Sequence, residues 1–145
     1  MRIRRFLKDR SAASATEFAV IAPVMAMAAL GMIDGWSFVS SILDTRAAVQ
    51  AGAKYVIQGG LNESSVQSVA MSAWAGRPQD AQITVEKKCY CTFFTADCAG
   101  LCVWTNKPPV TLYNIEATGT WTAPFEVKFL VPSQKITHKQ VIRVR

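Results

Sequence analysis

The hydrophobic pattern of the chain begins with an uninterrupted apolar stretch near the N-terminus. No charged residue occurs from Phe18 to Ile33, a run of 33 − 18 + 1, or 16, residues. As a helix it would be about 24 Å long, and one or two further turns bring it to the roughly 30 Å of a bilayer core. Asp34 and Trp36 would then lie at the far interface. The pattern predicts a transmembrane helix over residues 13–40. The alternative is a buried core helix, which this chain is too small to surround.

After this stretch the pattern changes to the period of an amphipathic helix. Gly59-Gly60 is expected to end that helix, and Asn62 to cap a second one that ends at Gly76-Arg77-Pro78. The first helix is expected to bury Ile42, Thr45, Val49, Gly52, Ala53 and Val56. The second is expected to bury Val66, Val69, Ala70, Ala73 and Trp74.

Beyond Pro78 apolar and polar residues alternate, which is the period of a β-strand. The predicted strands cover Ile83–Lys87, Val110–Trp121, Val127–Val131 and Ile136–Arg145. Short links between successive strands favour antiparallel pairing, with the sheet packed on the first helix. The predicted fold class is α+β.

Charge is concentrated at the N-terminus. The chain has 145 residues and a formal net charge of +6. Residues 1–12 contain five basic residues and one acidic residue, which gives +4 and leaves +2 for the rest. Positive flanks of membrane helices stay in the cytoplasm, so residues 41–145 are expected to form a periplasmic domain. A short basic leader, rather than a folded basic face, also argues against nucleic-acid binding.

Four cysteines lie close together in the part predicted to be exported, at Cys89, Cys91, Cys98 and Cys102. Clustered cysteines in such a domain indicate disulfides, and four cysteines allow three pairings. Because Cys89 and Cys91 share a strand face, each is expected to pair with Cys98 or Cys102 rather than with the other. A zinc site is the alternative, but the spacings CxC and CxxxC are not common in zinc fingers.

The mature N-terminus has three interpretations. The chain keeps Met1 as an uncleaved anchor, or it is cut after Ala28 in a small-x-small pattern, or it is cut between Ala12 and Ala13. The last interpretation gives Glu17 a role. Glu17 would be mature residue five, able to neutralise the α-ammonium group of a neighbouring subunit. Otherwise Glu17 is an interfacial residue or a favourable charge at a helix N-terminus.

The opening Arg10-Ser11-Ala12-Ala13-Ser14-Ala15-Thr16-Glu17-Phe18-Ala19, followed by Ala22-Pro23 and Gly31-Met32-Ile33-Asp34-Gly35, resembles TadE-like proteins. These are minor pseudopilins of the Tad (Flp, tight adherence) pilus system. The cysteine cluster and the strands at the C-terminal end extend the resemblance over nearly the whole chain. The resemblance implies a type IV pilin-like fold, prepilin peptidase cleavage between Ala12 and Ala13, and Glu17 as the assembly carboxylate. Ala12 stands where the family usually has Gly, so an uncleaved, TadG-like membrane anchor stays open.

These patterns favour a structural protein over an enzyme. The chain has one histidine, His138, and no nucleophile elbow, phosphate loop or paired-carboxylate signature. No cofactor and no metal are expected. The resemblance implies a single-pass inner-membrane protein whose partners are membrane lipid, pilins and other minor pseudopilins, and the prepilin peptidase. The Tad platform proteins and the secretion ATPase are expected to be indirect partners. The rival from another class is a soluble periplasmic binding or enzymatic domain released after Ala28.

Overall fold

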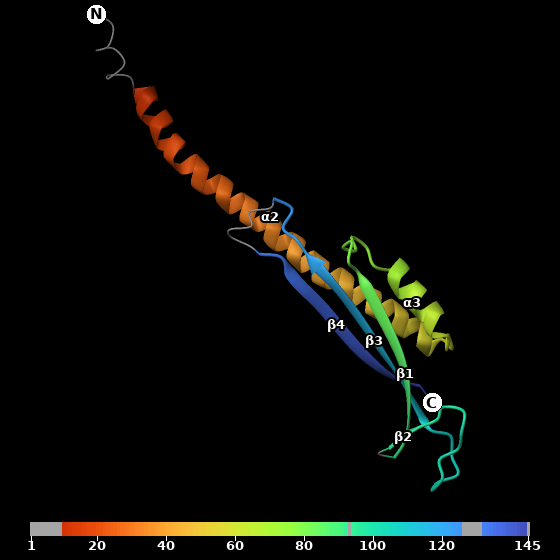
Figure 1. Cartoon of the computed structure of the whole chain (residues 1–145). Helices are drawn as coiled ribbons and strands as arrows, with labels where there is room; N and C mark the ends of the chain where they lie inside the picture. Colours follow the sequence, from red (N-terminus) through yellow and green to blue (C-terminus); the bar gives the residue numbers. More distant parts are fainter. Residues whose placement is uncertain (1–9, 93, 126–131, 145) are drawn as a thin grey trace, which may run out of the picture. The chain divides into compact units, whose positions relative to one another are not determined.

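The computed structural model describes residues 10–92, 94–125 and 132–144. It contains helices α2 (Arg10–Ile57) and α3 (Glu63–Ser72) and strands β1 (Gln82–Cys91), β2 (Phe94–Ala96), β3 (Val110–Trp121) and β4 (Gln134–Val144), as Figure 1 shows. The chain divides into two units, Met1–Ser37 and Phe38–Arg145. The predicted strand Val127–Val131 and most of the leader lie outside the described residues.

In the second unit, α2 is amphipathic and packs on the sheet. Thr45, Val49 and Val56 are buried, whereas Arg46 and Lys54 are exposed. The Thr45 hydroxyl donates a hydrogen bond to the Ser41 carbonyl at 2.7 Å, which satisfies a polar group that is almost fully buried. The buried face predicted for this helix is confirmed, except that Ile42 is only partly buried.

The connection to α3 is made by a glycine and an asparagine cap. Gly59 has φ +98°, a conformation that glycine adopts without steric strain, and the Gly60 amide donates to the Tyr55 carbonyl at 3.0 Å. The side chain of Asn62 accepts from the Ser64 amide at 3.0 Å. Both the helix end and the cap were predicted from the sequence and are confirmed.

The predicted end of α3 needs a correction. The helix ends at Ser72, before Gly76-Arg77-Pro78, and Ala73 is its C-cap. Ala73 is exposed rather than buried, because it lies past the last helical turn that faces the core. Trp74 is buried as predicted.

The four strands form one antiparallel sheet in the order β2-β1-β3-β4. The longest strand, β3, pairs with β1 on one side, with Val85 opposite Ile115, and with β4 on the other, with Tyr113 opposite Ile142. Alternate residues of β3 are buried, so the sheet has one covered face and one polar face. The predicted strand Val110–Trp121 is confirmed, whereas β2 was not predicted.

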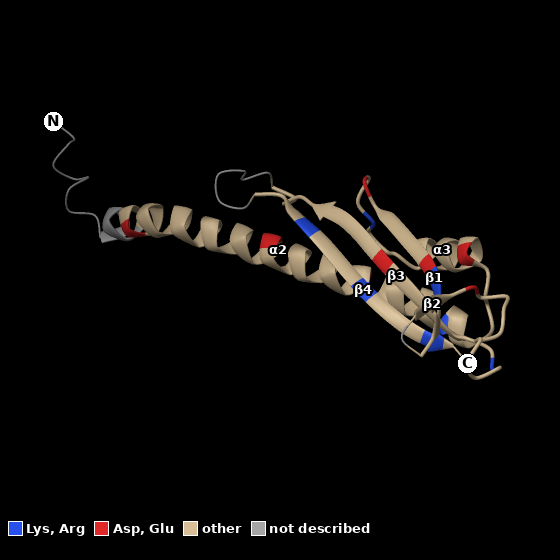
Figure 2. Ribbon diagram, turned by 60° about the horizontal axis from the view of Figure 1, so that its bottom comes forward, with Lys and Arg blue, Asp and Glu red and all other residues tan. Residues whose placement is uncertain are grey.

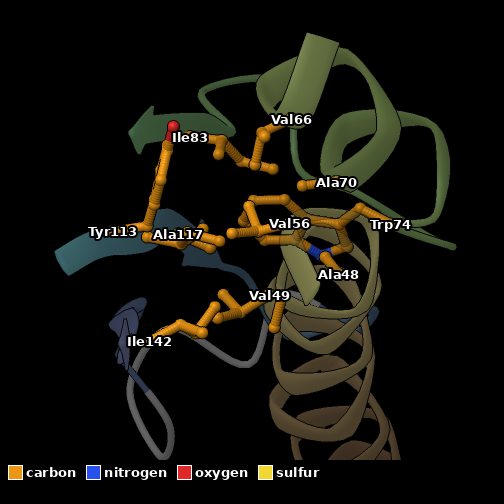
Figure 3. Packing of buried hydrophobic residues seen from close by; sticks show 12 residues of the cluster. Ala48, Val49, Val56, Val66, Ala70, Trp74, Ile83, Tyr113, Ala117 and Ile142 are labelled. Carbon is orange, nitrogen blue, oxygen red and sulfur yellow. The ribbon is translucent and has the colours of Figure 1, made fainter. Parts of the chain in front are cut away.

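Both helices cover the same face of the sheet, and Figure 3 shows the core between them. Val49 and Val56 of α2 and Val66 of α3 meet Tyr113 and Ile115 of β3, and all five are fully buried. A second cluster lies at the other end of β3. It contains Trp121, Ala123 and Ile136, with Phe38 and Ile42 packed against them.

Small residues allow the close approach of these elements. A Cβ atom added to Gly52 on α2 would lie 3.2 Å from the Cβ of Ala70 on α3. A Cβ added to Gly119 on β3 would lie 2.5 Å from Cγ of Pro78, a separation that real Cβ atoms essentially never show. The result is an α+β fold with a long N-terminal apolar helix packed on a four-stranded antiparallel sheet, which is the architecture of pilins.

Candidate functional site

The first unit presents an apolar helical surface. Between Ala15 and Ile57, α2 is long and apolar enough to cross a membrane by length and composition. Only 6% of its most apolar window is buried. Large side chains there are widely exposed, including Val20 and Met32, both at 74%. A core helix would be covered on most sides, so the alternative of a buried helix finds no support in the described part of the chain.

The predicted processing and assembly residues lie at the beginning of this helix. Ala12 and Ala13 are in the first turns of α2, and Glu17 follows one turn later. The side chain of Glu17 is exposed. The structure therefore places these residues on one element, with the carboxylate accessible to a neighbouring chain.

Asp34 is the unusual polar residue of the first unit. Its side chain is only 4% exposed, and Oδ1 has no hydrogen-bond partner among the residues that the structure describes. Sequence reasoning placed Asp34 at a membrane interface, where a carboxylate would be solvated. A buried, unsatisfied carboxylate oxygen is unfavourable, so this position is a candidate for a function other than stability.

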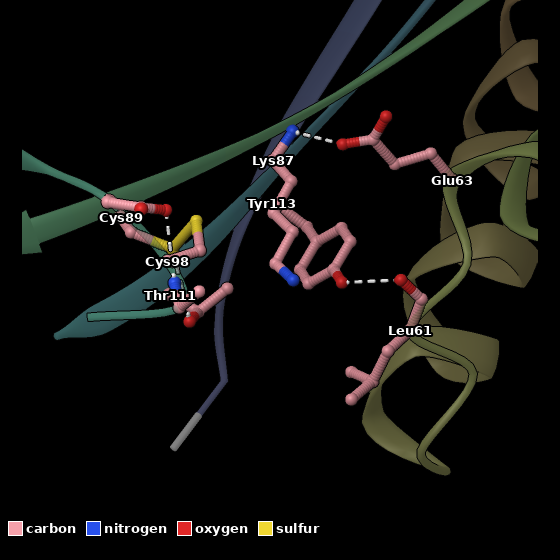
Figure 4. Close-up of a disulfide and its surroundings, with 9 residues drawn as sticks. Leu61, Glu63, Lys87, Cys89, Cys98, Thr111 and Tyr113 are labelled. Carbon is pink, nitrogen blue, oxygen red and sulfur yellow. Dashed lines mark hydrogen bonds between the residues drawn. A yellow bond between two sulfur atoms is a disulfide. The ribbon is translucent and has the colours of Figure 1, made fainter. Parts of the chain in front are cut away.

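The cysteines form two disulfides, Cys89–Cys98 and Cys91–Cys102. Each cysteine of β1 is joined to a cysteine of the following loop, which is the kind of pairing expected from the shared strand face. Cys89 is buried, and its Sγ lies 3.5 Å from Oγ1 of Thr111 on β3. Figure 4 shows the Cys89–Cys98 bridge next to Thr111. The two bridges fasten the long β1–β3 connection to the end of the sheet.

The fastened loop exposes apolar side chains. Val103 and Trp104 are 92% and 91% exposed, and Phe94 and Leu101 are also exposed. They line a cavity of about 440 Å³ next to the second disulfide. Sequence reasoning missed this surface, although the apolar residues around Cys102 in a polar loop were the available signal.

Two polar contacts join the sheet to the segment at the start of α3. The hydroxyl of Tyr113 donates to the Leu61 carbonyl at 2.7 Å, and the Lys87 amide donates to the Glu63 carboxylate at 3.0 Å (Figure 4). Burial raises the pKa of Tyr113 above its ordinary value, and the negative charge of Glu63 adds to the shift. These contacts tie the α2–α3 connection to β3 and the start of α3 to β1.

The charged groups of the sheet face solvent. Glu86 and Lys88 form an ion pair at 2.8 Å, which lowers the pKa of Glu86 and raises that of Lys88. Hydrogen bonds from Thr120 lower the pKa of Asp80. Within the described ranges, no three His, Cys, Asp or Glu side chains come together as a metal site.

The candidate site is thus an exposed apolar helix with a carboxylate near its start, joined in sequence to a disulfide-bonded α+β domain. Disulfides of this kind suggest a domain outside the cytoplasm. Comparisons with protein-family models, with curated proteins and with solved structures find no match to this chain.

Proposed function

We propose that this protein is a TadE-like minor pseudopilin, a structural component in the assembly of Tad (Flp) pili. One observation carries the proposal: the two parts of α2 differ in how much of their apolar surface is covered by the rest of the chain. Its first part exposes large apolar side chains, whereas residues from Thr45 to Val56 bury one face against a sheet. A helix of this kind suits a subunit that is held in a membrane before it packs among other helices.

The N-terminal residues add to this proposal. The opening from Arg10 to Ala19 resembles TadE-like proteins, and Glu17 is exposed on α2. In the proposed mechanism a prepilin peptidase cuts between Ala12 and Ala13. The new α-ammonium group of one subunit then pairs with the Glu17 carboxylate of a neighbour, because a desolvated charge needs an opposite charge beside it.

The protein would be a single-pass protein of the bacterial inner membrane, with the basic leader in the cytoplasm and the disulfide-bonded domain in the periplasm. Its partners would be membrane lipid, pilins and other minor pseudopilins. The platform proteins and the secretion ATPase of the Tad system would supply the work. The chain itself would act by assembly, without turnover of a substrate.

The mature N-terminus separates this proposal from its rivals. We expect intact-mass analysis of native protein to find a chain that starts at Ala13. A start at Ala29 would establish a soluble periplasmic protein instead, and a start at Met1 would establish a permanent, TadG-like anchor.

Replacement of the assembly carboxylate tests the mechanism. We expect Glu17→Ala to lower co-purification with pilins while the protein still inserts into the membrane, because only the charge partner is lost. Glu116→Ala, which removes a carboxylate from the polar face of the sheet, is the matched control and should leave co-purification unchanged. Equal co-purification of wild type and Glu17→Ala would contradict the paired-charge mechanism.

A further inference from the structure

A second cavity lies in the domain, between the beginning of its helix and its outermost strand. It has a volume of about 220 Å³. From α2 it is lined by Phe38, Ile42 and Arg46, which follow one another at intervals of four and so share one side of the helix. From β4 it is lined by Lys135, Ile136, Thr137 and His138.

One part of the lining is cationic. Arg46 on α2 and Lys135 on β4 are exposed cations. Because β4 is the edge strand, residues of both its faces border the cavity, with Lys135 on the exposed face and the half-buried His138 on the core-facing side. No acidic side chain lines the cavity, and neither Arg46 nor Lys135 has a carboxylate within ion-pair distance in the described part of the chain. The positive charge of Lys135 contributes to the lowered pKa of Asp80, whose main cause is hydrogen bonding to Thr120. The cavity therefore has positive charge available for an anion.

The basic character continues along the strand. Every charged residue of β4 between Gln134 and Val144 is basic, and Figure 2 shows the lysine and arginine positions spaced along it. Lys139 and Arg143 are exposed but do not line the cavity. They add positive potential along this edge of the sheet and serve as internal controls for residues that do line it.

The other part of the lining is apolar. Phe38, Ile42 and Ile136 belong to the second hydrophobic cluster, and the ring of Phe38 meets Trp121 edge-on with centroids 5.1 Å apart. Packing against this cluster holds the apolar wall in place beside the cations. A free inorganic anion would use the cations alone, whereas an amphiphile with an anionic head would use both parts.

The position of the cavity along the chain favours such an amphiphile. Phe38 follows Ile33, the last residue of the uncharged stretch, by 38 − 33, or five, residues within α2. If that stretch lies in the bilayer, as proposed above, lipid headgroups are the anions at hand. Basic side chains next to a membrane segment attract anionic headgroups.

We infer that this cavity binds the phosphate group of an anionic phospholipid. Arg46 and Lys135 neutralise the phosphate, since guanidinium and ammonium groups both donate to its oxygens. Phe38, Ile42 and Ile136 contact the adjoining apolar part of the lipid. The inference rests on the membrane anchorage of the proposed function, but not on pilus assembly.

Native mass spectrometry of the full chain in a neutral detergent tests it. With phosphatidylglycerol and phosphatidylcholine added in equal amounts, we expect retained phosphatidylglycerol to dominate. Arg46→Gln and Lys135→Gln should each lower the ratio of retained phosphatidylglycerol to retained phosphatidylcholine about fivefold. This is the change expected when one basic side chain beside an anionic headgroup is lost. Lys54→Gln and Lys139→Gln remove exposed lysines from the same two elements outside the cavity and should leave the ratio unchanged.

Three results would overturn the inference. The first is the same lipid ratio in wild type and in both cavity variants. The second is an equal fall of this lipid ratio in the control variants, which would indicate general attraction of anionic lipid to a basic surface. The third is displacement of phosphatidylglycerol by equimolar inorganic phosphate, which would assign the cations to a free anion. Alkaline extraction of the same membranes separates the two proposals: release of the full chain would refute anchorage, whereas retention without lipid preference would refute only the cavity.

Discussion

At the residue scale, Tyr113 and Gly119 show how single positions on β3 hold the domain together. Tyr113 is fully buried, and its only polar atom reaches the Leu61 carbonyl across the join between the two helices. Gly119 lies where Pro78 and Trp74 approach the strand. One residue supplies a partner for a backbone group, and the other supplies space.

Removal of the Tyr113 hydroxyl should weaken the domain. We expect Tyr113→Phe to lower the free energy of unfolding by about 1 kcal/mol, the net value of one ordinary hydrogen bond. Urea unfolding measures the difference. Tyr90→Phe is the control, because the Tyr90 hydroxyl makes no hydrogen bond within the described residues. Equal stability of wild type and Tyr113→Phe would show that this hydrogen bond contributes nothing.

The same residue makes stability depend on pH in the alkaline range. The ordinary pKa of tyrosine is 10.0, and burial raises that of Tyr113 in the folded chain. Above pH 10.0 the unfolded chain loses this proton first, so the Tyr113 contribution is present below that pH and is lost as pH rises through the folded-state pKa. The stability difference between wild type and Tyr113→Phe should therefore shrink above pH 10.0. A constant difference would contradict the shift.

The space at Gly119 is the subject of a third prediction. We expect Gly119→Ala to destabilise the domain by about 1–3 kcal/mol, because the new methyl group would overlap Cγ of Pro78 in a packed interior. Gly100→Ala is the matched control, since the nearest atom to its new Cβ would be the Asp97 carbonyl oxygen at 3.9 Å. Thermal unfolding compares the two, and equal melting temperatures would refute the steric explanation.

At the element scale, the disulfides decide the form of the β1–β3 connection. Cys89–Cys98 and Cys91–Cys102 close loops with sequence separations of 9 and 11 residues. Both loops contain β2, which pairs with the end of β1. A three-residue strand at the edge of a sheet has little stability of its own, so the two bridges that span it keep it paired.

We predict that loss of either bridge destabilises the oxidised domain. In the chain-entropy model, closing a loop of about ten residues stabilises a protein by about 2–3 kcal/mol. The double variants Cys89→Ser with Cys98→Ser, and Cys91→Ser with Cys102→Ser, should each lose about that much free energy of unfolding. In oxidising buffer the wild-type chain should therefore have a higher free energy of unfolding than either variant. After reduction this difference should become smaller. Thiol labelling of all four cysteines in denatured, unreduced periplasmic material would contradict the disulfides themselves.

At the scale of the whole molecule, the distribution of charge and apolar surface defines a direction along the chain. Five of the 16 basic residues precede the uncharged stretch, and the disulfide-bonded domain follows it. In the proposed membrane anchorage, the positive-inside tendency places the two ends on opposite sides of the bilayer. The polar face of the sheet and the oxidised loops suit the outer side.

This arrangement predicts the outcome of a topology experiment. In spheroplasts, external trypsin should digest the domain after Ser37 and leave the membrane-embedded stretch protected, because only the domain is on the outer side. Replacement of the five leader basic residues by glutamate should reduce the digested fraction, since the orientation signal is lost. Protection of the domain in the wild-type chain would refute the proposed orientation.

The elements of this protein could largely be predicted from local patterns. An uncharged run, a 3.6-residue period and an alternating period report which side of each segment avoids water, and they located α2, α3, β1, β3 and β4. The end of α2 at Gly59-Gly60 and the cap at Asn62 also followed from local backbone chemistry. The position of Glu17 one turn after Ala13 needs only a continuous helix.

Other features depend on contacts between distant residues, and only the tertiary structure decided them. A periodic hydrophobic pattern shows which residues are buried but not which residues they pack against. The sequence therefore did not determine the order of the strands, the pairing of Cys89 with Cys98, or the short strand β2. The cationic cavity brings Arg46 together with Lys135 and His138, about ninety positions later in the chain. Such sites arise because folding places segments side by side, and the energy that does so comes from the whole core rather than from the residues of the site.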